Sequence, residues 1–525
     1  MDDGLFSAIY TFTKDPTTDP QNLQGTGQAL AAFLLGLPNQ AYRNIGDTAA
    51  LMRSNSYHVY FQDDWKILPN LTLNLGLRYE YTQWPRHRDN KLASFDLETG
   101  QFLWAGKNPV TGEGPNTIPT LVPPDRNNFA PRFGFALLLN PKMSLRAGYG
   151  VFYNSNFLWE AQGVRGNWPY AISEALTALN TVHPTSPSRT TFTPDLDVQL
   201  GSTVAPGGQH IVDRRNRVGY CQQWNLHLQR EITRGLLVEA GYVGTKGTKL
   251  SVFLSGNDAS PGPGDPNPRR RYPALGAVSL MTAVGSSSYH GLQLKAEKRF
   301  SQGLSFLGSY AFSKTLNIGG DGFGASASPQ DSRNLKADRA LSGIHRQHNF
   351  VLNYIYELPF GQRWPYRGLW LRIAKSLIAG WEINGINAVR SGQPINVTIP
   401  RDIANVGSRG FFARPDLLRN PGLSSPTPAR WFDTGAFAEP EPNSFGNAGR
   451  NVVLGPGTSN WTMGLFKNFH FQERSKRLQF RVEAFNLLNQ VNLANPEVNF
   501  DSPRFGQILD SAPARQIQFG LKYLF

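Results

Sequence analysis

The chain has 525 residues, and 52 Lys and Arg against 38 Asp and Glu give a net charge of +14, yet charged residues make up only 17%. Soluble domains usually carry about 25% charged residues, so this composition argues against an ordinary soluble enzyme. Aromatic residues at 12% exclude a disordered chain, and the single cysteine, Cys221, excludes an internal disulfide framework.

Apolar runs in the sequence are too short for a helical membrane span. A transmembrane helix needs about 20 consecutive apolar residues, whereas the best run, 29–37, stops at Pro38. The N-terminal MDDGLFSAIYTFTKD is acidic and differs from the basic start of a secretory signal peptide. One membrane architecture still fits, the transmembrane β-barrel, because its alternating strands have low mean hydropathy.

Alternation of apolar and polar residues predicts β-strands along the whole chain. In LTLNLGLRYEY at 71–81, Leu and Tyr take one face, and Thr, Asn, Gly, Arg and Glu take the other. Such a strand of roughly ten residues can cross a bilayer at a tilt. The pattern predicts about fourteen strands, near residues 4–13, 55–65, 71–82, 129–139, 143–153, 220–230, 235–244, 288–299, 303–313, 347–358, 378–390, 460–472, 477–487 and 514–525.

Short and long connections alternate between these strands. Most short links resemble KILPN at 66–70, with 358–377 as a longer exception, and the long segments are rich in Pro, Gly, Ser and Asn. Outer-membrane barrels have short periplasmic turns and long extracellular loops, and long loops are uncommon in compact soluble domains. The predicted fold class is therefore all-β, a transmembrane antiparallel β-barrel. The long segments are 14–54, 83–128, 154–219, 245–287, 314–346, 391–459 and 488–513.

Charges of both signs recur on the polar faces of the strands. A soluble barrel fills its interior with apolar side chains, whereas mixed charges suit a wide hydrated lumen, and the apolar face then suits lipid. Pairing that holds adjacent strands is the favoured role for these charges, with ligand guidance as the alternative. The lumen-facing candidates are Arg78, Glu80, Arg146, Glu239, Lys295, Glu297, Glu382, Arg390, Arg481 and Glu483.

Motifs for catalysis, cofactors and metals give no candidate residues, so the chain is not predicted to be an enzyme. The segment 244–249 is rich in Gly and Lys but lacks P-loop spacing, and G-x-S-x-G is absent from the sequence. His345 and His348 would point to opposite sides of a strand, and 256–268 is interpreted as a flexible loop. The Lys and Arg residues are dispersed, which argues against nucleic acid as a partner.

The segment HVYFQDDWKILPNLTLNLGLRYEY at 58–81 resembles the barrel of TonB-dependent outer-membrane transporters, specifically the Oar-like branch. Further similar segments are 30–38, 132–153, 380–397 and 480–492. The ending GLKYLF resembles the terminal signal of outer-membrane proteins, which the barrel assembly machinery reads. That resemblance implies an assembly signal formed by Phe519, Leu521, Tyr523 and Phe525.

The resemblance implies a 22-stranded barrel occluded by an N-terminal plug, with a TonB-contacting segment ahead of it. Against that pattern, residues 1–525 are expected to form one barrel domain, the C-terminal part of such a transporter, lacking the plug and about eight strands. The expected location is the Gram-negative outer membrane. The expected partners are its lipid and lipopolysaccharide, the assembly machinery, an unknown transported ligand, and TonB only through a plug.

The leading functional hypothesis is uptake of a ligand across the outer membrane by a TonB-dependent receptor. The alternatives are a passive porin of about fourteen strands and a surface adhesion or structural protein. Steady conductance in planar bilayers would favour the porin, and protease shaving of intact cells with matrix-binding assays would address adhesion. TonB-dependent uptake by this chain alone would contradict the expectation that a plug is required.

Overall fold

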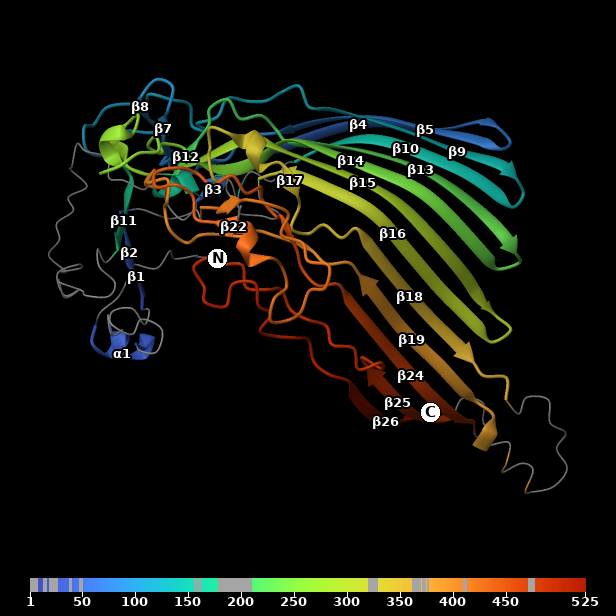
Figure 1. Cartoon of the computed structure of the whole chain (residues 1–525). Coiled ribbons are helices and arrows are strands. Elements are labelled where there is room, and N and C mark those ends of the chain that lie inside the picture. Colours follow the sequence, from blue (N-terminus) through green and yellow to red (C-terminus); the bar gives the residue numbers. More distant parts are fainter. Residues whose placement is uncertain are drawn as a thin grey trace.

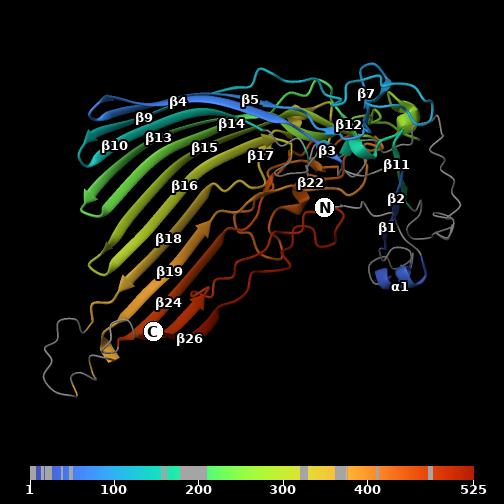
Figure 2. The ribbon, with the colours of Figure 1, turned by 180° about the vertical axis from the view of Figure 1, so that it is seen from behind.

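A strongly curved β-sheet dominates the computed structural model (Figures 1 and 2). The structure describes residues 8–12, 17, 27–36, 40–46, 51–154, 158, 161, 163–177, 210–319, 329–360, 370, 374, 377–408, 413–470 and 477–525. The sheet has 15 strands, and thirteen of them follow one another in chain order as antiparallel neighbours. The predicted all-β antiparallel architecture is therefore confirmed.

The thirteen consecutive strands are β4 (Ser56–Leu68), β5 (Leu71–Thr82), β9 (Phe129–Asn140), β10 (Met143–Tyr153), β13 (Tyr220–Thr233), β14 (Leu236–Ser255), β15 (Ser279–Ser301), β16 (Leu304–Ile318), β18 (His348–Glu357), β19 (Trp381–Arg390), β24 (Thr458–His470), β25 (Arg477–Phe485) and β26 (Gln516–Leu524). Two short strands join them: β17 (Ala340–Leu341) beside β16, and β12 (His210–Val212), which runs parallel to β15. Among the described strands, β4 and β26 each pair with one neighbour, so the sheet is curved but open.

Short turns gather at one end of the strands and long connections at the other, as the sequence predicts (Figure 1). Two residues join β4 to β5, β9 to β10, β13 to β14, and β15 to β16. The link between β18 and β19 is the predicted longer exception. We call these two ends of the sheet the turn end and the loop end.

Three predicted strands differ from the structure. The first, at 4–13, corresponds in its described part to β1 (Ala8–Thr11), which pairs with β2 (Gln40–Gly46) in a separate three-stranded sheet completed by β11 (Ala171–Thr177). Strands β14 and β15 extend well past their predicted ends, into the loop end. Register shifts near Thr248 and Leu250 interrupt the two-residue period there, so the alternation ends before the pairing does.

The remaining elements are short and belong to the connections. Within the described residues, the structure contains no helix with the length and apolarity required to cross a bilayer. The strand pairs are β3 (Met52–Arg53) with β6 (Arg86–His87), β7 (Ala93–Asp96) with β8 (Gln101–Trp104), β20 (Pro394–Ile395) with β23 (Val453–Leu454), and β21 (Asp416–Leu417) with β22 (Phe437–Ala438). The helices are α1 (Ala29–Leu34) and the 3₁₀ turns η2 (Gly163–Gly166), η4 (Asn267–Arg269), η5 (Pro273–Leu275), η6 (Leu335–Asp338) and η7 (Thr434–Ala436).

The buried apolar clusters of the described residues lie at the loop end and not on the sheet faces. One is centred on Leu92 and Leu121, both fully buried, a second contains Ile211 and Phe95, and a third surrounds Val397. Burial of such side chains contributes roughly 1.5–3 kcal/mol each. The long connections are therefore a folded unit, which we call the loop cap.

Residues 256–268, predicted to be a flexible loop, are docked within the loop cap. Arg270 donates hydrogen bonds to the carbonyls of Asn257 and Gly407 at 2.6 Å each, and the Asn405 amide donates to Gly262 and Gly264. The contacts with Gly407 and Asn405 connect segments more than 130 residues apart. The prediction was wrong because Gly and Pro content indicates irregular backbone, whereas order here comes from a partner segment distant in sequence.

Gly392 lies where the chain leaves β19 for the loop cap. A Cβ on Gly392 would overlap the backbone carbonyl of Gly455, whose own N–H donates to the Gln393 carbonyl at 2.8 Å. We therefore expect Gly392→Ala to destabilise the protein by about 1–3 kcal/mol through overpacking, as urea unfolding would measure. Gly76→Ala is the control, because its Cβ would meet its nearest atom at an ordinary 3.6 Å; equal losses in both variants would contradict the interpretation.

His345 anchors the connection between β16 and β18 to the sheet. Its Nδ1 accepts a hydrogen bond from the Thr315 N–H at 3.3 Å, and burial, with Arg346 and Lys314 nearby, lowers the pKa of His345 below its ordinary 6.5. A lowered folded-state pKa gives stability that is present above pH 6.5 and is lost as pH falls through the lowered value. We expect the urea midpoint to fall from pH 7.5 to pH 5. His345→Gln should flatten this dependence, and an unchanged slope in that variant would assign it to other groups.

Candidate functional site: the polar face of the sheet

Strand register places all ten predicted lumen-facing residues on the same face of the sheet. Arg146 pairs with His227, which pairs with Gly241, and the same row continues through Gln293 to Arg390. Because directly opposed residues share a face and residues two apart in one strand share it too, the face extends across the sheet. We call it the polar face. The structure thus places the ten residues on one surface, while its assignment to a lumen stays a prediction.

Near the loop end of β5, Arg78 and Glu80 form an ion pair at 2.8 Å. Across the hairpin, His58 Nδ1 lies 4.0 Å from the same carboxylate. On β4, Asp64 accepts a hydrogen bond from the Asn74 amide at 2.6 Å. These contacts join β4 to β5 through polar side chains.

Glu239 connects β13 to β14 in the middle of the sheet. Its carboxylate lies 3.0 Å from His227 Nδ1 and accepts a hydrogen bond from the Gln229 amide at 3.3 Å. On β15, Lys295 and Glu297 pair at 2.8 Å, and Lys295 is opposite Glu239 in the ladder. A half-buried carboxylate with two partners fits the predicted structural role for these charges.

The other half of the polar face repeats this arrangement with more amides. Glu382 accepts from the Asn384 amide at 3.0 Å, and Arg390 donates to the Asn349 side chain at 3.1 Å. Arg481 donates to Gln479 at 2.6 Å, and its guanidinium stacks 4.8 Å from the Phe466 ring centre. Neutral amides therefore take part, together with the charged residues, in the side-chain contacts on this face.

Glu297 and Glu483 are the two predicted residues that meet in one hollow. The hollow has a volume of about 610 Å³ and extends from β15 to β25. In the ladder, one row runs from Glu297 through Asn353 to Thr462, and the next row runs from Asn384 through Gly464 to Glu483. Two carboxylates, two amides and the hydroxyls of Thr462 and Ser305 thus line a cavity of the size of small-ligand sites.

The chemistry of this hollow is that of binding. Carboxylates accept hydrogen bonds and attract cations, amides donate and accept, and a hydroxyl does both. Among the described residues, no group of three or more His, Cys, Asp and Glu could hold a metal ion. Arg299 and Lys298 also line the hollow, so a polar, hydrated molecule is the ligand that this mixed set of groups would accommodate.

Asn353, Thr462 and Ser305, which also lines the hollow, were missed by the sequence reasoning. They are neutral, so charge did not mark them, and they approach Glu297 only through pairing across several strands. The two histidines of the HRQH segment have different partners: His345, ahead of β18, accepts a hydrogen bond from the Thr315 N–H, and His348, the first residue of β18, bonds Tyr310 Oη at 2.7 Å.

The opposite, apolar face of the sheet is exposed. Leu75, Phe133 and Tyr149 are neighbours in one row, and each is at least 37% exposed. At the edge, Phe519, Leu521 and Tyr523 of β26 lie on this face with more than half of their surface exposed, and Phe525 follows at 91%. Their role as an assembly signal stays a prediction.

Comparison with known proteins gives a family for the chain. The model of the outer membrane beta barrel domain matches residues 2–518. No protein of curated function matches the chain.

Comparison with solved structures gives matches at low sequence identity. The outer membrane transporter YddB from Escherichia coli is 11% identical with a TM-score of 0.45, and the match covers 92% of this chain and 54% of that chain. A mutant ferric enterobactin receptor, PfeA, from Pseudomonas aeruginosa is 9% identical with a TM-score of 0.43, covering 92% and 50%. P. aeruginosa FpvA bound to pyoverdines is 10% identical with a TM-score of 0.42, and the match covers 93% of this chain and 40% of that chain. The chain thus spans about half the length of these proteins.

The alternating faces, the loop cap and the match along nearly the whole sequence agree on one architecture. The chain belongs to the outer membrane β-barrel domain family, and its location is the Gram-negative outer membrane.

Proposed function

We propose that this chain supplies the β-barrel of a TonB-dependent receptor, of the Oar-like branch, that takes up a polar ligand across the outer membrane. The observation that carries the proposal is the polar face, where charges and amides cover the sheet and where Glu297 and Glu483 line one hollow. A hydrated pathway needs such a surface, whereas a packed soluble barrel does not.

The folded loop cap supports capture of a ligand at the cell surface. Its segments are held by ion pairs, such as that of Arg401 with Asp501 at 2.7 Å and with Glu439 at 3.0 Å, as well as by apolar clusters. Binding sites are commonly carried on loops that a rigid scaffold positions. The proposed path therefore begins at the cap and continues along the polar face. In this proposal, TonB acts only through a plug.

Uptake in cells tests this proposal. The probes are a ferric siderophore, cobalamin, an oligosaccharide and an oligopeptide, each measured with the chain present or deleted and with TonB present or deleted. We expect uptake of one probe to require both proteins. Glu297→Gln with Glu483→Gln should reduce that uptake by about tenfold, which corresponds to 1.4 kcal/mol of lost interaction.

Asp63→Asn with Glu231→Gln is the matched control, because it removes two carboxylates outside the hollow. The control should retain uptake. Steady conductance of the purified chain in planar bilayers, together with TonB-independent uptake, would replace the proposal with the passive porin.

A further inference from the structure

Between β13 and β24, the apolar face carries charges of one sign. In the regular ladder of β13 to β24, acidic residues such as Glu239, Glu297 and Glu382 lie on the polar face. The charged residues on the apolar face of these strands are all basic: Arg230, Lys246, Lys298, Lys314 and Lys467. Pairing between protein charges therefore does not account for these cations.

The basic residues mark the two edges of the apolar band. Lys246 and Lys314 lie toward the loop end, whereas Arg230, Lys298 and Lys467 lie toward the turn end. Long basic side chains at such positions extend their charge to the membrane interface, where the phosphates of lipid headgroups lie. Lys467 is the exception, because it is buried and donates to the Ala379 carbonyl. The turn end faces the periplasm in outer-membrane barrels.

A hollow lies beside Arg230 on the apolar face. Its volume is about 540 Å³, and Ala240, Ala296 and Gly308 form its floor because their side chains are small. A Cβ on Gly308 would make ordinary van der Waals contact with Leu352 Cδ1 at 3.7 Å, so a side chain can be added there without a clash. Apolar side chains, including Leu294, form the walls, and Arg230 lines the hollow.

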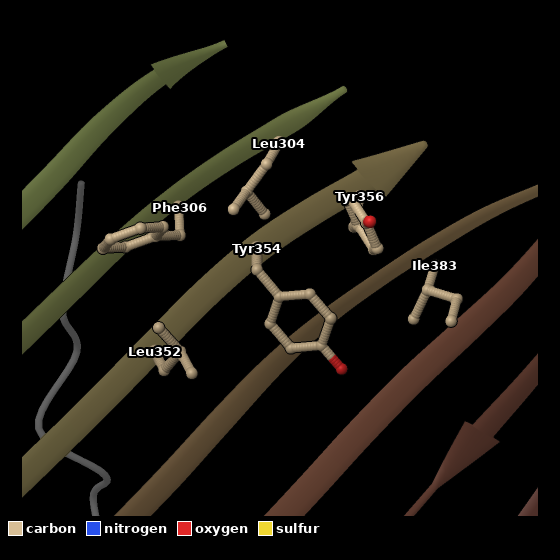
Figure 3. A pocket seen from close by; sticks show the side chains of 6 residues that line it. All are labelled: Leu304, Phe306, Leu352, Tyr354, Tyr356 and Ile383. Carbon is tan, nitrogen blue, oxygen red and sulfur yellow. The ribbon is translucent and has the colours of Figure 1, made fainter. Parts of the chain in front are cut away.

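A second apolar hollow, of about 450 Å³, lies on the same face (Figure 3). Its six lining side chains come from β16, β18 and β19. The tyrosine hydroxyls are the only polar groups on these side chains. Leu352 pairs with Gly308 in the ladder, so the two hollows are neighbours across β16 and β18. The lining residues are Leu304, Phe306, Leu352, Tyr354, Tyr356 and Ile383.

We propose that these two hollows bind the acyl chains of one anionic phospholipid of the periplasmic leaflet, whose phosphate is held by Arg230 and Lys298. The two residues lie on the strands flanking β14, two strands apart and two residues out of line, which is about 12 Å in the sheet, a span that their long side chains can close around a phosphate. Lys298 donates to Ser301 Oγ at 2.8 Å, which leaves further N–H groups for the lipid. Because the acids of β13 to β24 are confined to the polar face, this part of the edge favours an anionic headgroup over one carrying an ammonium group.

Spin-label electron paramagnetic resonance on the full chain, reconstituted in phosphatidylethanolamine vesicles, tests the site. The probes are spin-labelled phosphatidylglycerol and phosphatidylethanolamine, and the readout is their relative association constant. We expect the wild type to prefer phosphatidylglycerol by at least about fivefold per basic residue, and Arg230→Gln with Lys298→Gln to abolish the preference. Gly308→Leu should displace both lipids, because it fills the hollow.

Arg477→Gln with Lys522→Gln is the matched control, since it removes one Arg and one Lys from the turn end of the polar face. This control and the conservative pair Arg230→Lys with Lys298→Arg should keep the preference, and heat-modifiable migration in gels checks folding of each variant. A wild type without preference, or a control that loses it, would overturn the proposal. Equal competition by lipid A would overturn the assignment to the periplasmic leaflet.

Discussion

Asp338→Asn should destabilise the loop cap by about 3–5 kcal/mol, the cost of leaving a buried charge without its partner. Asp338 accepts a hydrogen bond from Arg414 at 2.5 Å, and both side chains are at most 4% exposed. Arg450, also buried, donates to the Asp338 and Asn317 carbonyls, so the cluster joins the cap to the end of β16. Urea unfolding, followed by protease resistance of the cap, measures the loss.

Asp501→Asn is the control for this prediction. Asp501 also binds an arginine, Arg401, through two hydrogen bonds at 2.7 and 2.8 Å, but that pair is exposed and its loss should cost within about 1 kcal/mol. Replacing both buried partners, as in Asp338→Leu with Arg414→Met, should recover much of the loss because no unpaired charge is left. Similar costs for the two asparagine variants would show that burial does not decide the energy.

Leu294→Arg should destabilise the assembled barrel by about 2–4 kcal/mol, the cost of an Arg on the lipid face near the bilayer midplane. Leu294 lies on the apolar face of β15 between Ala240 and Tyr310, and 41% of its surface is exposed. The guanidinium of the new arginine would be transferred from water into hydrocarbon, because the sheet separates it from the polar face. Urea unfolding from lipid vesicles measures this cost.

Gln293→Arg on the adjacent position provides the comparison. Gln293 points to the polar face, where small Gly241 and Ala311 flank it, so an added guanidinium should stay hydrated and cost little. The two variants have the same new side chain, one residue apart, and differ only in the face. A larger loss for Gln293→Arg would reverse the assignment of the faces to lumen and lipid.

The faces of the sheet could be predicted from the sequence because they depend only on the two-residue period. Leu71 to Tyr81 shows both faces in eleven letters, and the structure keeps each of those residues on the predicted side. The short turns were equally predictable, since a strand of bilayer length must reverse where alternation stops. The two-residue period does not show which strands pair with one another. For this reason β1 was predicted as a strand, but its place in a separate sheet was not predicted.

The loop cap and the hollow required information that no local pattern contains. Asp338 and Arg414 are 76 positions apart, and both lie in segments without periodicity. Glu297 and Glu483 were predicted individually, but their common hollow depends on the register of every ladder between β15 and β25. Sequence therefore gave the candidate residues of the site, and long-range pairing gave their neighbours.

Because the buried apolar clusters lie in the cap and not on the sheet, one part of the chain is stabilised in water and the other in the lipid bilayer. The cap, centred on residues such as Leu92 and Val397, is held together by expulsion of water and should respond to urea like a small globular protein. The sheet turns its apolar face outward, so its stability is set by the thickness and composition of the bilayer. Changes in denaturant and changes in lipid should thus act on different parts of the same molecule.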